Sequence, residues 1–160
     1  MKILVLSDSH GHRENMLRAV EQSAPDLIIH LGDCVRDTEC LEQSYPAIPL
    51  WQVRGNCDFA PTAPESGLEE LDGVRIFFAH GHRHNVKINM DSFCNSVYFS
   101  GARLGLYGHT HRARWNRVGA VEILNPGSIG DHLHPTYALV ETCGNGAFSC
   151  HIHDLEEDEK

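Results

Sequence analysis

The stretch KILVLSDSH, residues 2–10, joins an almost unbroken apolar run to a polar end. β-Branched residues and leucines fill positions 3–6, without the alternation that a half-exposed strand shows. A short run of this kind is typical of a strand buried on both faces, as in a parallel sheet covered by helices. The sequence therefore predicts a strand over residues 2–7, with Asp8 just beyond its carboxyl end.

Two later segments, 26–31 (DLIIHL) and 48–53 (IPLWQV), show similar short apolar runs. The residues between the runs indicate helices over 11–24 and 35–44, the first of them ended by Pro25. An order of strand, helix, strand, helix and strand at this spacing predicts parallel βαβ units with right-handed crossovers. The first third of the chain is thus expected to form a parallel sheet with helices.

The pattern changes after Asn56, where turn signals separate pairs of short apolar segments. The dipeptide at residues 72–73 is Asp-Gly, which favours a hairpin with a type I′ turn. Two further hairpins are expected around residues 119–120 and 143–146, together with a helix over residues 89–102. The later part of the chain is therefore predicted to be mainly antiparallel with one helix.

The composition is that of an acidic globular chain of 160 residues, with 41% hydrophobic and 22% charged residues. This length suits a single domain, expected over residues 1–155, followed by an acidic tail over residues 156–160. The net charge of −9 argues against binding to duplex nucleic acid or to a membrane surface, because anionic phosphates would be repelled. The apolar residues of segment 92–99 (SFCNSVYF) could pack against the core or against a second copy of the chain, so a homo-oligomer is an open alternative.

No segment approaches a membrane span in length, and the apolar run at the amino terminus is too short for a signal peptide. The six cysteines form no CxxC pair. In a chain without an export signal, such cysteines are expected to be reduced thiols that mostly fill the core. The sequence therefore predicts a cytoplasmic protein.

Polar residues with ligand chemistry follow the predicted strands. Asp8, Asp33 and Asn56 each come just after one of the three parallel strands, about one βαβ period apart. Because ligands bind outside the carboxyl ends of strands in an open parallel sheet, these side chains should share one rim. Glycines at the same places would let the chain turn sharply or leave a strand: Gly11, Gly32, Gly55 and Gly108. Four histidines also follow apolar segments: His10, His80, His109 and His111.

Two carboxylates, one amide oxygen and four imidazoles form a donor set suited to borderline divalent metals such as manganese, iron, zinc or cobalt. Seven ligands exceed the usual number for one ion, so two ions that share a carboxylate are the economical arrangement. Each feature alone has a structural explanation, since Asp8 could cap the helix that follows it and His-x-His pairs recur in a chain with twelve histidines. Five such features in order, all at strand ends, favour the metal site.

Six short motifs carry a resemblance to a known family: DSH (8–10), GD (32–33), GNCD (55–58), HGH (80–82), GHTH (108–111) and NPGS (125–128). In order and spacing they resemble the calcineurin-like metallophosphoesterases, most closely the small bacterial and archaeal phosphodiesterases of that superfamily. The resemblance implies an α/β fold, a four-layer α/β/β/α sandwich of two mixed sheets flanked by helices, with a dimetal site at one edge. It implies two ligand sets with Asp33 as the bridge: Asp8, His10, Asp33 and His111 for one ion, and Asp33, Asn56, His80 and His109 for the other.

The activity implied is hydrolysis of small soluble phosphate esters, most of all diesters, through attack by a metal-activated hydroxide. Manganese is the expected metal, with iron, zinc, nickel and cobalt as alternatives. Two other functions stay open: a phosphomonoesterase, and a non-catalytic scaffold of the same fold that binds other proteins. The short chain has no room for a capping domain, so an open site of broad specificity is expected.

The sequence departs from the larger members of the superfamily beside the metal-binding asparagine. Many of those relatives have a histidine directly after it, where the imidazole can protonate the leaving group, but this chain has Cys57 after Asn56. A thiol with an ordinary pKa near ~8.5 is a poor proton donor to an alkoxide. His12, His82 and Asp58 could take over this role, so the candidate catalytic residues are Asn56, Cys57, Asp58 and His82.

Overall fold

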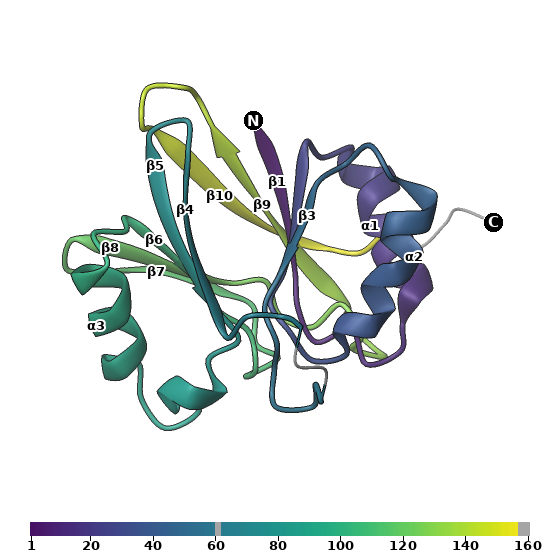
Figure 1. Ribbon diagram of the computed structural model, residues 1–160, viewed down its shortest axis with the longest axis horizontal. Coiled ribbons are helices and arrows are strands. Elements are labelled where there is room, and N and C mark those ends of the chain that lie inside the picture. The colour runs from purple at the N-terminus through teal and green to yellow at the C-terminus, as the bar shows by residue number, and fades with distance from the viewer. Residues whose placement is uncertain (60–61, 157–160) are drawn as a thin grey trace.

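The computed structural model describes residues 1–59 and 62–156, which form two five-stranded β-sheets with helices on their outer faces (Figure 1). The strand order is β10-β9-β1-β2-β3 in the first sheet and β4-β5-β6-β8-β7 in the second. Helices α1 and α2 lie against the first sheet and α3 lies against the second (Figure 1). This is the four-layer α/β/β/α arrangement of two mixed sheets that the resemblance implied, and the prediction of the fold class is confirmed.

The elements follow one another along the chain with these bounds. The strands are β1 (Lys2–Leu6), β2 (Leu27–His30), β3 (Leu50–Gln52), β4 (Ser66–Leu71), β5 (Val74–Ala79), β6 (Leu104–Leu106), β7 (Arg114–Val118), β8 (Val121–Asn125), β9 (Thr136–Thr142) and β10 (Phe148–Asp154). The helices are α1 (Arg13–Ser23), α2 (Glu39–Ser44) and α3 (Asp91–Phe99), with short 3₁₀ turns η1 (Val35–Thr38) and η2 (His82–His84). The helix predicted over 35–44 is therefore a 3₁₀ turn that continues into α2.

The first sheet begins as the sequence predicts, because β1, β2 and β3 pair in parallel. Helix α1 covers it with an apolar face, on which Met16 packs with Leu4 of β1. The helix ends at Ser23, and Ala24 adopts a left-handed conformation with φ of 44° just before Pro25. This ending is expected, since the residue before a proline is disfavoured in the α region.

The hairpin of β4 and β5 has the predicted turn. Asp72 and Gly73 both have positive φ, 49° and 76°, as a type I′ turn requires. The strands on either side pair antiparallel in the register of Leu71 opposite Val74.

The expectation that the later part of the chain is mainly antiparallel is wrong for the centre of the second sheet. β5, β6 and β8 pair in parallel there, and only β4 and β7 at the edges are antiparallel to their neighbours. Helix α3 supplies the crossover between β5 and β6, and β7 is placed outside β8. The hairpin of β9 and β10 joins the first sheet instead, where β9 pairs antiparallel with β1.

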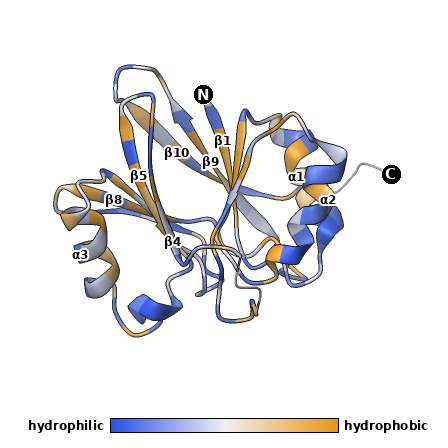
Figure 2. Ribbon diagram, in the orientation of Figure 1, coloured by the Kyte–Doolittle hydropathy of each residue, from blue (hydrophilic) through white to orange (hydrophobic). Residues whose placement is uncertain are grey.

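The main core lies between the two sheets. It includes Ile3 and Val5 of β1 together with Ile76 of β5 and Leu104 of β6, all fully buried. Figure 2 shows hydrophobic residues along the strands of both sheets. Each such buried side chain contributes roughly 1.5–3 kcal/mol to stability, so the loops between the strands are held on a rigid support.

Segment 92–99 packs one face of α3 into the core and leaves another exposed. Phe93 and Val97 are fully buried, whereas Tyr98 and Phe99 are 60% and 81% exposed. The homo-oligomer stays a prediction.

Among residues 1–59 and 62–156, no helix has the length and apolar character that crossing a bilayer requires. Of the expected acidic tail, only Glu156 is described, and its carbonyl oxygen accepts a hydrogen bond from Gln22 Nε2 at 3.0 Å. Residues 157–160 of that tail lie outside the described residues.

Candidate metal centre

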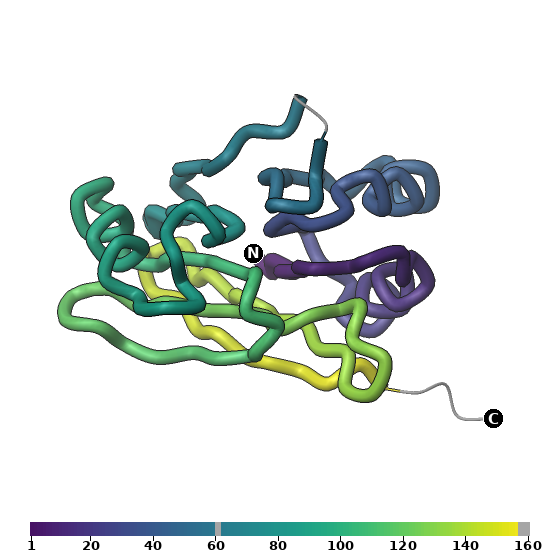
Figure 3. Tube along the Cα trace, turned by 90° about the horizontal axis from the view of Figure 1, so that it is seen from below, coloured from purple at the N-terminus to yellow at the C-terminus, as the bar shows by residue number. Residues whose placement is uncertain are grey.

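The loops that follow β1, β2, β3, β5 and β6 meet at one edge of the molecule, the lower side of Figure 1 and the side facing the viewer in Figure 3. They bring together two groups of side chains with metal-ligand chemistry: Asp8, His10 and His111 in one, and Asp33, His80 and His109 in the other. Within each group the ligand atoms all lie within 4.8 Å of one another. The Nε2 atoms of His10 and His111 are 3.4 Å apart, a separation that two ligands of one ion can have.

Asp33 lies between the two groups. Its Oδ2 is 3.9 Å from His10 Nε2, and its Oδ1 is 3.5 Å from His80 Nε2. Asn56 joins the second group, with its Oδ1 at 3.1 Å from His80 Nε2. The structure therefore places all seven candidate ligands in one cluster, with the Asp33 carboxylate facing both sides of it.

Burial and hydrogen bonding orient His80. Its side chain is fully buried, and Nδ1 lies 2.8 Å from the carbonyl oxygen of Leu31, to which it must donate a hydrogen. In the neutral ring, Nε2 then carries the lone pair and points at Asn56 and Asp33. Fixing the tautomer through the second ring nitrogen is the usual way in which proteins prepare a histidine ligand.

Asp8 has one oxygen that the protein leaves without a hydrogen bond. Oδ2 accepts hydrogen bonds from the hydroxyl of Ser7 at 2.5 Å and the N–H of His109 at 3.1 Å. Oδ1 is buried and has no hydrogen-bond partner among the described residues, although His111 Nε2 lies 3.1 Å away outside hydrogen-bonding orientation. A buried, ionised oxygen is costly without a cation or donor. The orphaned oxygen and the mixed imidazole and carboxylate donors fit a divalent ion.

The electrostatic environment keeps Asp33 and His109 in the protonation states that metal binding needs. Burial opposes ionisation of Asp33, but contact with His80 and the N–H of Cys57 holds the pKa of Asp33 well below its usual range. Burial, the charge of His80 and the charge of Lys87 lower the pKa of His109 to about 4. His109 is therefore neutral at pH 7 and has a lone pair for a metal.

Contact with a carboxylate raises the pKa of two other imidazoles, those of His80 and His111. Burial lowers the pKa of His80, but the contact with Asp33 and the charge of Asp8 outweigh it and raise the pKa overall. Contact with Asp8 likewise raises the pKa of His111. In the protein without metal, a proton on these rings and a divalent ion are alternative ways to balance the two carboxylates.

Strained backbone is concentrated at the centre. Five of the seven candidate ligands have positive φ: Asp8 (55°), His10 (43°), Asp33 (60°), His109 (67°) and His111 (57°). Non-glycine residues in this region cost of order 1–3 kcal/mol each and persist where the surrounding structure imposes them. Aspartate and histidine adopt positive φ more often than most non-glycine residues, but nothing local in the sequence indicates which of them do so here.

Gly55 and Gly108 allow the side chains of Asp33 and Asp8 to lie close to the backbone. A Cβ atom at Gly108 would lie 2.0 Å from Ser7 Oγ and 2.9 Å from Asp8 Oδ2, and one at Gly55 would lie 2.1 Å from Asp33 Oδ1. Neither glycine has positive φ, so neither uses the left-handed conformation that glycine adopts freely. Their missing side chains make room for the carboxylates.

Asp58, a candidate proton donor, is committed to the backbone. Its Oδ2 accepts hydrogen bonds from the N–H groups of Asp33 at 2.9 Å and Gly55 at 2.8 Å, and its Oδ1 accepts one from Val35 at 2.9 Å. The bonds from Asp33 and Val35 tie the loop after β3 to the segment after β2, and the bond from Gly55 closes the loop after β3 on itself. The structure thus places Asp58 where it positions the loop that carries Asp33.

Asp37, which no sequence motif marks, has a similar function one loop away. Its Oδ2 accepts hydrogen bonds from the N–H of Gly11 at 2.7 Å and the hydroxyl of Ser9 at 2.8 Å. These bonds hold the segment that carries His10. No pattern identified Asp37 beforehand, because an aspartate in a short helical segment is ordinary.

The NPGS motif anchors two ligand loops. Asn125 Nδ2 donates to the carbonyl oxygen of Gly108 and to Thr110 Oγ1, both at 3.0 Å, and the hydroxyl of Ser128 donates to the carbonyl oxygen of Asp8 at 2.8 Å. In the sequence, the motif is apparent only as part of the family resemblance. Its role was hidden because these bonds connect residues 15 to 120 positions apart.

The other candidates for a proton donor lie in different surroundings. Desolvation and the charge of Asp33 raise the pKa of the exposed Cys57 thiol to about 11. The ring of His82 lies beside that of His80, 5.3 Å between centroids. His12 turns away from the cluster, and its Nε2 is 3.3 Å from His132 Nδ1 beside a separate cavity of about 340 Å³.

Comparisons with known proteins agree with this geometry. The model of the calcineurin-like phosphoesterase superfamily domain matches residues 1–145. The probable metallophosphoesterase YsnB of Bacillus subtilis is 34% identical over 136 residues, which cover 81% of this chain and 75% of that protein. Phosphodiesterase MJ0936 of Methanocaldococcus jannaschii is 26% identical over 161 residues, covering 89% of this chain and 93% of that protein.

The fold is also shared with proteins of distant sequence. A solved structure of Vps29 from Entamoeba histolytica superposes with a TM-score of 0.75 at 20% identity, covering 98% of this chain and 100% of that one. At this identity the likeness shows the fold alone.

Proposed function

This chain belongs to the calcineurin-like phosphoesterase superfamily, and on that premise we propose that it is a phosphodiesterase with two divalent metal ions. Its substrates in this proposal are small phosphate esters, and manganese is the proposed metal, with iron, zinc, nickel and cobalt as alternatives. The name of the Methanocaldococcus relative supports diesters as the substrate class.

The observation that carries the proposal is the pair of donor groups on either side of Asp33. In the proposal, one ion is held by Asp8, His10, Asp33 and His111, and the other by Asp33, Asn56, His80 and His109. When bound, two such ions lower the pKa of a water molecule and neutralise charge on the phosphate oxygens.

The protein's own side chains prepare this arrangement before any substrate arrives. Asp58 and Asp37 fix two of the ligand loops by accepting hydrogen bonds from backbone N–H groups and from the Ser9 hydroxyl, so little reorganisation is needed during the reaction. The Cys57 thiol, with its high pKa, is a weak proton donor beside Asn56. We therefore expect fast hydrolysis for esters whose leaving groups depart without help from a proton.

The first test measures hydrolysis of bis(p-nitrophenyl) phosphate by protein that has been stripped with a chelator and then supplied with Mn²⁺. Activity should be absent without metal and should return with it, because metal coordination lowers the pKa of bound water to about 7 and so supplies hydroxide at neutral pH. The same assay with p-nitrophenyl phosphate shows whether monoesters are also cleaved.

Full activity in the stripped protein would contradict metal dependence. Failure to take up metal, measured by elemental analysis after dialysis against Mn²⁺, would instead favour a non-catalytic scaffold of the same fold.

A further inference from the structure

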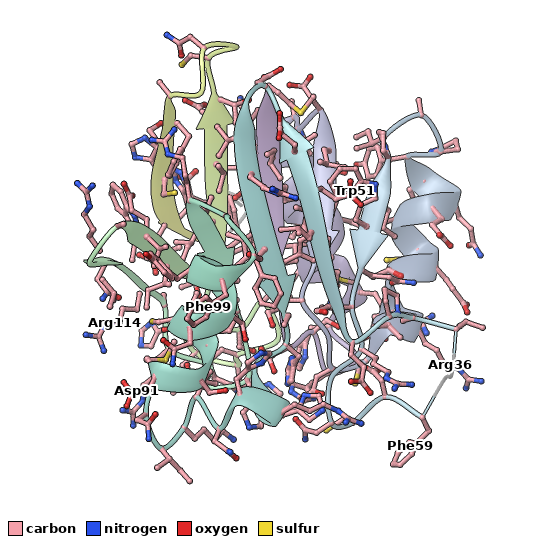
Figure 4. The ribbon with its side chains drawn as sticks, turned by 60° about the vertical axis from the view of Figure 1, so that its left-hand side comes forward. Arg36, Trp51, Phe59, Asp91, Phe99 and Arg114 are labelled. Carbon is pink, nitrogen blue, oxygen red and sulfur yellow. The ribbon has the colours of Figure 1, made fainter. Side chains whose placement is uncertain are left out.

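A cavity of about 550 Å³ lies beside the candidate metal centre, between the segment before α3 and the segment that links β6 to β7. Three cationic side chains line it: Lys87, Arg112 and Arg114. The buried ring of Tyr107 and the side chain of Thr110 also line it. Arg114 extends outward from the start of β7, near the lower end of α3 (Figure 4).

Within the described part of the chain, these three cations have no counterion beside them. No acidic residue lines the cavity, and none of the three forms an ion pair with any described residue. They also gather in a chain whose net charge is −9. Like charges that converge without a counterion repel one another, so the free protein gains nothing from the cluster. An anionic ligand would remove that repulsion.

The cavity adjoins the metal centre through the GHTH motif. Thr110 lies between His109 and His111 in the chain, so the two imidazoles face the metal centre while the residue between them lines the cavity. Asn125 holds Thr110 in place through a hydrogen bond of 3.0 Å to its Oγ1. One small molecule can therefore place a phosphate at the metals and another group in the cavity.

We propose that this cavity binds a second phosphoryl group of the substrate, so that the enzyme prefers phosphate esters that carry another phosphate elsewhere in the molecule. The inference rests on the proposed function. Two guanidinium groups and an ammonium group match the charge and the hydrogen-bond acceptors of a phosphoryl group, since guanidinium binds phosphate oxygens in bidentate geometry.

The cavity on the other side of the centre is a weaker candidate for this role. It is lined by Arg13 and Arg36, but Arg13 already pairs with Asp37 at 3.2 Å, and Asp37 and Asp58 both line the same space. Arg36 and Phe59 lie at the opposite side of the molecule from Arg114 in Figure 4. The concentration of unpaired positive charge therefore favours the cavity at Arg114.

The test compares two esters that differ by one phosphate: the p-nitrophenyl ester of thymidine 5′-phosphate, and the same ester with a phosphate on the 3′ oxygen. With Mn²⁺ present, kcat/KM should be about ten-fold higher for the 3′-phosphorylated ester, the scale of a few charge-assisted contacts. The preference should shrink as salt rises. In the triple variant Lys87→Gln, Arg112→Gln, Arg114→Gln, the ratio of the two kcat/KM values should fall close to one.

The matched control is Arg117→Gln, which removes one exposed positive charge from β7 outside the cavity and should keep the ratio. A wild-type ratio near one would overturn the inference while leaving the phosphodiesterase intact. A raised ratio that survives the triple variant, or is lost equally in the control, would overturn it as well.

A binding measurement separates this inference from the proposed function. Calorimetry with thymidine 3′,5′-bisphosphate and thymidine 5′-monophosphate, on protein with and without Mn²⁺, needs no turnover. If neither ester is hydrolysed, the proposed function fails, and the inference then stands only if the bisphosphate binds more tightly and the triple variant loses that difference.

Discussion

At the scale of single residues, the carboxylate of Asp33 is the point where the two donor groups meet. The N–H of Cys57 donates to its Oδ1 at 2.9 Å, and Gly55 leaves the space in which it lies. Its ionised form is favoured by contact with His80. A residue that is fixed, charged and reachable from two sides has the properties that a bridging ligand needs.

Replacement of Asp33 tests this role directly. Asp33→Asn keeps the shape but removes the shared charge, so we expect metal content to fall by at least one ion per chain and diesterase activity to fall with it. His134→Ala is the control, because His134 is exposed and lines the separate cavity near His12. Elemental analysis after dialysis checks both variants, and equal metal content in the two would contradict the bridging role.

Cys57 leads to a second prediction at this scale. With a thiol whose pKa is about 11 beside Asn56, the departing oxygen carries most of its charge without a proton. Rates across a series of aryl phosphodiesters should fall steeply as the leaving-group pKa rises. Cys57→His should flatten that slope and speed the poorest leaving groups by up to ~10²–10⁴, the range of a positioned acid.

The slope is informative only where chemistry limits the rate, which pre-steady-state measurements establish. A shallow slope in the wild type would mean that another group, such as His82, already donates the proton. His82→Ala should then steepen it. Neither result would alter the assignment of the metal ligands.

At the scale of elements, strands supply rigidity and the loops after them supply chemistry. Strands β1, β2 and β6, which lead to the site, are almost wholly buried, whereas the loops hold ligands in left-handed conformations. Such strain is stable only because the strand ends on both sides are fixed by the core. We therefore expect substitutions in the core strands to weaken metal binding as well as stability.

Ala24, directly after helix α1, has a left-handed conformation but is not a candidate metal ligand. It therefore shows the energetic cost of positive φ separately from metal binding. Ala24 is exposed, has φ of 44° and ends the helix through its N–H bond to the carbonyl of Val20. Ala24→Gly should raise the free energy of unfolding by about 0.5–1 kcal/mol, because glycine adopts this conformation freely. Urea unfolding measures the change.

A β-branched residue at the same position supplies the opposite control. Ala24→Val should lower stability, since valine is strained at positive φ. If glycine and valine shift the unfolding midpoint in the same direction, the helix end is not held in the left-handed conformation.

At the scale of the whole molecule, burial of His30 ties stability to pH. His30 is fully buried, its Nδ1 accepts a hydrogen bond from the N–H of Gly32, and its Nε2 has no partner among the described residues. Burial lowers the pKa of His30 to about 4, with nearby Asp8 and Asp58 opposing the shift. The unfolded chain has an ordinary pKa near ~6.5 and takes up a proton first.

The direction of the change in stability with pH depends on how many protons the folded and unfolded states bind. Below pH 6.5 the unfolded state binds more protons than the folded state, so stability is fully present above that pH and is lost as pH falls toward 4. Between pH 7 and 4.5, the metal-free protein should lose about 2–3 kcal/mol through this group. In His30→Gln, urea unfolding should show a smaller loss over the same range, and an equal loss in both proteins would contradict the role of His30.

By itself, the sequence determined which segments form strands and which polar residues follow them. Apolar runs such as residues 3–6 specify buried strands through local periodicity, and Asp8, Asp33 and Asn56 follow such runs directly. The Asp-Gly turn of the first hairpin was equally local. The family resemblance added the two mixed sheets, because motif order along a chain reflects a shared topology.

Only the tertiary structure decided which strands pair and what each polar side chain contacts. The return of β9 to β1 and the parallel centre of the second sheet depend on packing between distant segments. The commitment of Asp58 to three backbone N–H groups and the gathering of cations around Arg112 have the same origin. Local periodicity determines which residues are buried, but partners across the chain are chosen by the shape and hydrogen bonding of the assembled core.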